Sequence, residues 1–223
     1  MCNAFFSQQN AGAAWAGGGR ARILLAEKGI AHNTVQVDLR TKEQLSDAFR
    51  AINPQCTVPA LHIEDGTGDG TKAGLVFTDN ASIAAYLEAA YPQPPLMGST
   101  PAEKAEIASW HWRVEFEGLL AIAEALRNSA PAMENRALPG PVDYAQIPAL
   151  AQRGLARVQQ FMDMLDQHLA GRTYLAAEQF SIVDITAVVA IDFARVVRVK
   201  PGEQHVHLRR WREAMALRPS FSL

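Results

Sequence analysis

The stretch Asn53–Gly66 has the sequence NPQCTVPALHIEDG and decides how the rest of the chain is interpreted. Its second proline, Pro59, opens a short apolar run, and a proline is tolerated as the first residue of a strand because no ladder donor is lost there. The preceding residue, Val58, is restricted to extended geometry. A trans bond is the default interpretation, because most X-Pro bonds are trans, whereas a cis bond would turn the Val58 main chain outward as a hydrogen-bonding edge.

The composition describes a soluble globular protein and excludes several classes of function. The chain has 223 residues, a formal net charge of −2 and 20% charged residues, enough for one large domain or two modest ones. No block of lysine or arginine indicates nucleic-acid binding, and no apolar run approaches the roughly 20 residues that cross a bilayer. The first residues lack the features of a secretory signal, and Cys2 and Cys56 have no metal-binding spacing. We expect a cytoplasmic protein without a metal, a nucleic-acid partner or a membrane partner.

The pattern up to residue 91 predicts a small mixed sheet with helices packed on it. Predicted strands and helices alternate, and the glycine-rich residues 8–19 predict a loop between the first strand and the first helix. The first two strands should be parallel because a helix joins them, and the last two should form a hairpin. The expected strands are 3–7, 32–39, 60–64 and 75–78, and the expected helices are 20–28, 42–52 and 81–91.

A proline-rich segment separates this half from a second half that predicts helices only. Pro92-Gln93-Pro94-Pro95 interrupts every periodic pattern, as a linker does. We therefore expect an N-terminal domain over 1–91, a linker over 92–100 and an all-helical domain over 101–223. Ser181 and Asp184 should form a capping box, which is a structural role. The expected helices of this half are 101–128, 149–170, 182–197 and 206–217.

These features together resemble the cytosolic glutathione transferase family of bacterial type. Four strings carry the resemblance, in the family's order: RARILLAEKGI at 20–30, NPQCTVPAL at 53–61, TDNASIAAYL at 78–87 and S-x-x-D at 181–184. The likeness runs from about residue 20 to the end of the chain. It implies an α/β thioredoxin-like N-terminal domain that binds glutathione and an all-α C-terminal helical bundle. It also implies that the Val58–Pro59 bond is cis.

The resemblance further implies which residues hold glutathione as a co-substrate. Val58, in the loop with Thr57 and Pro59, would pair through its main chain with the cysteinyl unit, as an added strand does. Asp79 and Asn80 occupy positions where the family has Glu and Ser, which face the ammonium and carboxylate of the γ-glutamyl unit. Asp and Asn are competent for both tasks, although either one could instead be a plain helix N-cap.

The chain departs from the family where the chemistry needs a donor near the glutathione sulfur. The family supplies a Tyr, Ser or Cys about ten residues before the arginine that corresponds to Arg22, and this register falls on Gly12. Three explanations stay open for this atypical segment, residues 1–19. Ser7 could be the donor, with a longer loop after it. A main-chain N–H could act instead. The segment could also be a non-homologous start, for instance from a shifted reading frame.

The helical half offers candidates for a second-substrate pocket. Trp110, Arg113 and Glu117 share one face of the predicted helix 101–128 by their i, i+3 and i+7 spacing. They could line the pocket, or they could be core packing and a salt bridge. The function we expect is a homodimeric enzyme that conjugates glutathione to a small hydrophobic electrophile, or reduces that electrophile with glutathione. The alternative is a glutathione-binding or protein-interaction homologue with little or no catalytic activity.

Overall fold

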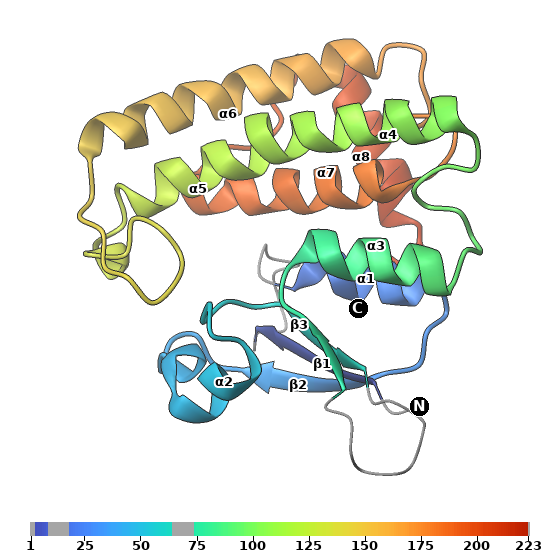
Figure 1. Cartoon of the computed structure of the whole chain (residues 1–223). Helices are drawn as coiled ribbons and strands as arrows, with labels where there is room; N and C mark the ends of the chain where they lie inside the picture. The colour runs from blue at the N-terminus through green and yellow to red at the C-terminus, as the bar shows by residue number, and fades with distance from the viewer. Residues whose placement is uncertain (1–2, 9–17, 64–73, 223) are drawn as a thin grey trace.

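The computed structural model describes residues 3–8, 18–63 and 74–222. It has a four-stranded mixed sheet with helices α1 and α3 against it, and a helical part that lies beyond those helices (Figure 1). The sheet order is β2-β1-β3-β4, with β1 parallel to β2 and antiparallel to β3, and β3 antiparallel to β4. The predicted parallel pair and the predicted hairpin are therefore confirmed. The strands are β1 (Asn3–Gln8), β2 (Asn33–Val37), β3 (Ala60–Ile63) and β4 (Leu75–Phe77).

The helices begin and end at local signals in the sequence. Helix α1 ends before Gly29, which has a φ of 64°, a conformation that glycine adopts without strain. Ser181 and Asp184 form the predicted capping box, and Thr100 with Glu103 forms a second one. The helices are α1 (Gly19–Glu27), α2 (Asp47–Ile52), α3 (Asn80–Ala90), α4 (Pro101–Arg113), α5 (Leu120–Arg127), α6 (Pro148–His168), α7 (Ile182–Phe193) and α8 (Val206–Ala216).

Two of the predicted helices are interrupted by 3-10 turns. In place of one helix over 42–52, a 3-10 turn (Glu43–Leu45) precedes α2, because Ser46 is extended and its side chain accepts a hydrogen bond from the Phe49 N–H. The predicted helix over 182–197 likewise changes to a 3-10 turn at Ala194–Val197. These short tight turns are common at helix ends.

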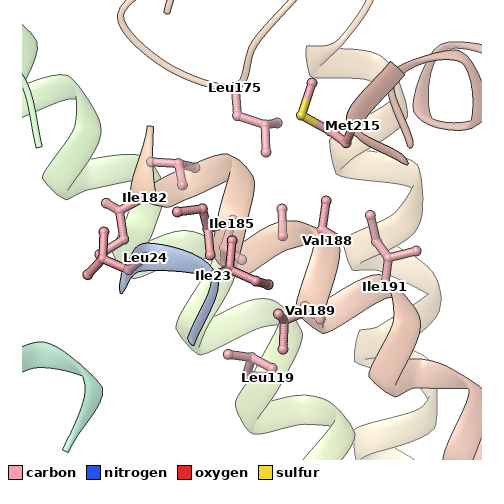
Figure 2. Close-up of a cluster of buried hydrophobic side chains, with 14 of the residues drawn as sticks. Ile23, Leu24, Leu119, Leu175, Ile182, Ile185, Val188, Val189, Ile191 and Met215 are labelled. Atoms are coloured by element: carbon pink, nitrogen blue, oxygen red, sulfur yellow. The ribbon is translucent and has the colours of Figure 1, made fainter. Parts of the chain in front are cut away.

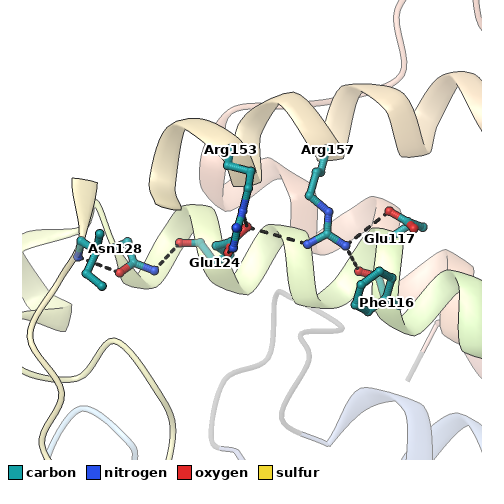
Figure 3. Close-up of polar contacts among 7 residues, drawn as sticks. Phe116, Glu117, Glu124, Asn128, Arg153 and Arg157 are labelled. Atoms are coloured by element: carbon teal, nitrogen blue, oxygen red, sulfur yellow. Dashed lines mark hydrogen bonds and ion pairs between the residues drawn. The ribbon is translucent and has the colours of Figure 1, made fainter. Parts of the chain in front are cut away.

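The predicted helix 101–128 contains a π-helical segment, η2 (Val114–Leu119), between α4 and α5. A π turn spans more residues than an α turn, so a main-chain carbonyl is left without its usual partner. Arg157 of α6 donates to the Phe116 carbonyl at 2.5 Å and pairs with Glu117 at 3.3 Å (Figure 3). Its other terminal nitrogen lies 3.7 Å from Glu124, which also pairs with Arg153. Helix α6 therefore fixes the irregular turn in place.

The hydrophobic core is continuous from the sheet side to the helical side. Ile23 and Leu24 of α1 pack against α7, next to Ile182 and Ile185 (Figure 2). All four side chains are buried. Burial of such side chains stabilises a protein by about 1.5–3 kcal/mol each. This contact sets the orientation of α1, and with it the position of the side chains in the first turn of α1.

Candidate functional site

A cavity of about 900 Å³ lies between the sheet side and the helical side. One wall comes from the loop before β3 and from the start of α3, and the other comes from α4, η2 and α5. Of the sequence-predicted glutathione residues, all five line it: Thr57, Val58, Pro59, Asp79 and Asn80. Residues that are distant in the sequence are thus brought to one site.

The loop before β3 is organised by the fully buried side chain of Asn53. Its amide nitrogen donates to the Thr57 carbonyl at 2.7 Å, and its amide oxygen accepts from the Gln55 N–H at 2.9 Å. The Val58–Pro59 peptide bond is cis. Within the described residues, neither the N–H nor the C=O of Val58 has a hydrogen-bond partner. This loop therefore presents a free main-chain donor and a free acceptor beside the cavity.

The start of α3 places two polar side chains on the cavity. Asp79 is the N-cap, and its carboxylate accepts from the Ser82 N–H at 2.8 Å and from the Ser82 hydroxyl at 2.9 Å. The capping role left open from the sequence is therefore realised. Asn80 differs, because its side-chain oxygen is buried and has no hydrogen-bond partner. A buried polar atom without a hydrogen-bond partner lowers the stability by about 1–3 kcal/mol. A ligand that donates a hydrogen bond to this oxygen would remove that cost.

A charged cluster joins the two walls of the cavity. Arg20, in the first turn of α1, forms an ion pair with Glu115 of η2. Glu115 also lies 3.6 Å from the Nε2 atom of His111, and this atom is 3.0 Å from the hydroxyl of the buried Thr186 on α7. Burial is the main cause that lowers the pKa of His111, and Arg20 lowers it further while Glu115 opposes the shift. The neutral form of His111 is therefore favoured, and a neutral imidazole can accept a proton.

The second wall is largely apolar. Ile107 is buried, whereas Trp112 and Leu120 line the cavity with 62% and 50% of their area exposed. Trp112 stacks on Phe116 with ring centroids 5.4 Å apart. Exposed side chains of this size are suited to bury an apolar ligand, because each removes a large area from water when it is covered.

The predicted second-substrate residues lie elsewhere. Trp110 stacks on His168 of α6, and Arg113 lies over the Trp110 ring. Glu117 pairs with Arg157 on the side that faces α6 (Figure 3). None of the three is part of the cavity lining. Successive residues of an α-helix are rotated by about 100° around its axis. The face of α4 that carries Ile107, His111 and Trp112 therefore lines the cavity, and the adjacent face with Trp110 and Arg113 does not.

Ser7, the candidate sulfur donor, is also outside the cavity lining. It lies within β1, which extends to Gln8, and is 3% exposed. A Cβ atom added to Gly18 would come within 3.1 Å of the Ser7 hydroxyl oxygen, so the two residues are close neighbours. Gly12, the other position considered, lies outside the described residues. In the described lining there is no serine, tyrosine or cysteine.

Comparisons with known proteins agree with this architecture. A family model for the N-terminal domain of glutathione S-transferases matches residues 18–90, and one for their C-terminal domain matches residues 130–219. Glutathione S-transferase 2 of Saccharomyces cerevisiae is 31% identical over 204 residues, which cover 90% of this chain and 82% of the yeast protein. This chain belongs to the glutathione S-transferase family. The N-terminal match begins at residue 18, so the atypical segment falls almost entirely outside it.

Solved structures place this glutathione S-transferase family member near two related proteins. A glutathione S-transferase domain-containing protein of Marinobacter aquaeolei superposes with a TM-score of 0.82 at 29% identity, covering 98% of this chain and 99% of the other. Gtt2 of Saccharomyces cerevisiae gives a TM-score of 0.82 at 28% identity, covering 98% of both chains. The predicted fold class, an α/β thioredoxin-like domain followed by an all-α domain, is confirmed.

Sequence reasoning missed the Arg20, His111 and Glu115 cluster of this family member. Arg20 belongs to a string that predicted helix α1, but nothing local showed that its partner lies on the helical side.

Two further findings concern the described residues alone. No group of three or more His, Cys, Asp or Glu side chains among them could hold a metal ion. No helix in the described part of the chain is long and apolar enough to cross a membrane.

Proposed function

We propose that this protein is a glutathione transferase that joins the sulfur of glutathione to a small hydrophobic electrophile, or uses glutathione to reduce it. The observation that carries the proposal is a single cavity that combines the free main-chain edge of Val58 with an apolar wall. One wall fits a peptide, and the other fits an apolar compound. A thiolate is the attacking form in such reactions, and a nearby positive charge favours it.

Glutathione would bind as a short added strand. The N–H and C=O of Val58 would pair with the cysteinyl unit, beside Thr57 and Pro59. The unmet oxygen of Asn80 would accept from the γ-glutamyl ammonium, and the first amides of α3 would hold the γ-glutamyl carboxylate. Asp79 would add its negative charge near the ammonium while it caps α3.

The electrophile would lie against α4 and α5. We assign its pocket to Ile107, Trp112 and Leu120, which replace the predicted set on the neighbouring face of the helix. Their apolar surfaces favour a hydrophobic compound over a charged one.

We further propose a homodimer in the cytoplasm, with the domain division at residues 92–100. Exposed apolar side chains on β4 and on the α4–α5 side support self-association, since Leu75 is 57% exposed and Phe116 is 41% exposed. Light scattering after size-exclusion chromatography tests this, with twice the chain mass expected.

Retention on immobilised glutathione and a conjugation assay with an aromatic chloride test the proposed function. Asp79→Ser keeps an N-cap but removes the charge, so it should weaken glutathione binding without loss of stability. Thr100→Ala is the matched control, because it removes an N-cap outside the cavity and should lower stability while the dissociation constant is unchanged. A folded protein that is not retained refutes glutathione binding. Retention without conjugation or peroxide reduction would support the non-catalytic alternative.

A further inference from the structure

The described lining of the cavity has no serine, tyrosine or cysteine, and its hydroxyls belong to Thr57 and Thr78. A charged donor stabilises an anion more strongly than a neutral hydroxyl does, so the cations of the lining are the stronger candidates to stabilise a thiolate. Two cations line it, Arg20 on α1 and Lys104 on α4. An opposite charge within about 4–6 Å lowers the pKa of an acid by roughly 1–3 units. Either cation could therefore lower the pKa of the glutathione thiol. The surroundings of the two side chains decide which one is better placed to do so.

Arg20 is largely buried, with 14% of its side chain exposed, and it is only partly satisfied. A guanidinium has five N–H donors, and the ion pair with Glu115 occupies the terminal nitrogen Nη1. The Nε nitrogen is buried and has no acceptor. An acceptor of negative charge that reached this side of the guanidinium would satisfy it. Arg20 is thus a cation that still has an unpaired N–H donor, and Glu115 on the opposite wall holds it in place.

The position of Arg20 also suits the sulfur. Glutathione held at Val58 must direct its thiol toward the apolar wall, because the electrophile binds there. Arg20 belongs to the same domain as Val58, and its ion pair with Glu115 brings it against the helical wall. Lys104 lies on α4 itself, on the turn before Ile107, and its side chain is exposed. The point where the two walls meet is therefore occupied by Arg20.

We propose that Arg20 stabilises the glutathione thiolate and that Glu115 positions Arg20. This rests on the proposed function. The S–H bond breaks, its electron pair stays on sulfur, and the proton leaves to solvent. The guanidinium donates to the sulfur until the sulfur forms a bond to the electrophilic atom, whose leaving group departs with its own electron pair.

The other titratable groups on the cavity do not take this role. Asp79 and Glu88 are acids, and Glu88 is paired with the buried Lys28. Lys104 is exposed to solvent, which screens its charge. His111 lies beside Glu115 and Thr186, and its burial favours the uncharged form. Arg20 is the cation that is largely shielded from solvent and still has a buried N–H without an acceptor.

The experiment measures the pKa of the thiol of bound glutathione from the ultraviolet absorbance of the thiolate. Arg20→Met should raise this pKa by about 1–3 units relative to the parent, and Arg20→Lys by less. Lys104→Met removes a charge from the same cavity and should leave the thiol pKa unchanged. Arg40→Met, at an arginine whose side chain is 70% exposed, should leave both activity and thiol pKa unchanged.

The possible results separate this proposal from the proposed function. A parent that binds glutathione and lowers its thiol pKa, with Arg20→Met and Arg20→Lys both folded and without effect on that pKa, overturns the role of Arg20 alone. Loss of stability with an unchanged thiol pKa overturns it too, since that is the result of a merely structural ion pair. A shift caused by Lys104→Met instead assigns the role to Lys104. A parent that does not bind glutathione overturns the proposed function, and the role of Arg20 with it. If Arg20→Met does not fold, Arg20→Lys decides the matter.

Discussion

Replacement of Gly154 by alanine should destabilise the protein, although alanine is the better helix former. Gly154 lies within α6 and is buried against α5. A Cβ atom placed there would lie 2.6 Å from the Ala125 nitrogen and 2.8 Å from the Ala121 oxygen. Both are main-chain atoms of a neighbouring helix, so no side-chain rotation removes the clash. The two helices must move apart.

The size of the effect follows from two opposing terms. Alanine in place of glycine inside a helix raises the free energy of unfolding by about 1 kcal/mol through its higher helix propensity. Overpacking costs about 1–3 kcal/mol, and a clash with a rigid backbone belongs at the upper end. We expect the free energy of unfolding to fall by about 2 kcal/mol, which for a chain of this length lowers the melting temperature by roughly 4–8 °C. Movement of α6 would also loosen the contact of Arg157 with η2.

Chemical and thermal unfolding, followed by circular dichroism, measure this change. Ala156→Gly is the matched control, because Ala156 is an exposed residue of the same helix and should show the propensity cost of about 1 kcal/mol alone. If Gly154→Ala raises the stability by about the amount that Ala156→Gly lowers it, helix propensity decides the outcome and the argument from close packing is refuted.

Three further substitutions have clear expected outcomes. Asp184→Ala leaves several buried donors without an acceptor, including the Leu175 N–H, and should lower the free energy of unfolding by about 3–5 kcal/mol in denaturant titrations. Lys28→Met leaves the carboxylate of Glu88 without its buried cation, so a similar loss of about 3–5 kcal/mol is expected by the same method. Burial raises the pKa of Glu27, but hydrogen bonds from Arg218 and Ser220 outweigh it and lower the pKa overall. Glu27→Gln should therefore cost about 1 kcal/mol at pH 7. The gap to the parent should narrow as the pH falls below the ordinary glutamate pKa of 4.5 and close once the pH is below the lowered pKa of the folded-state carboxylate; a gap that is independent of pH contradicts this assignment.

Local signals were enough to predict most of the elements. The end of α1 follows from Gly29, and the start of α7 follows from Ser181 and Asp184, because each signal acts within a few residues. The helix predicted over 42–52 failed for the same kind of reason, since Ser46 caps α2 and thereby ends the preceding turn. The π turn after Arg113 has no such local mark, because the contacts of Arg157 from another helix hold it.

The residues of the candidate site also fall into those that the sequence could predict and those that depend on contacts in the folded protein. Val58 and Asp79 could be expected at a binding site because the short strings that contain them resemble those of the family, and both line the cavity. Trp110 could not be oriented, since the choice between two neighbouring faces of α4 depends on its packing against His168. Arg20 could not be identified either, because its partner Glu115 is 95 residues further along the chain. Pairing at that distance is a property of the folded molecule.

The contact between α1 and α7 has a consequence for how this protein could be recombined with its relatives. Ile23 and Leu24 belong to the N-terminal sequence, but their packing partners are in the C-terminal sequence. A chimera joined at the linker would inherit one half of this core from each parent, and its halves would have to match in shape. The N-terminal and C-terminal sequences are therefore separate along the chain, but their packed side chains have to come from the same parent. A chimera that folds well would take α1 and α7 from one parent.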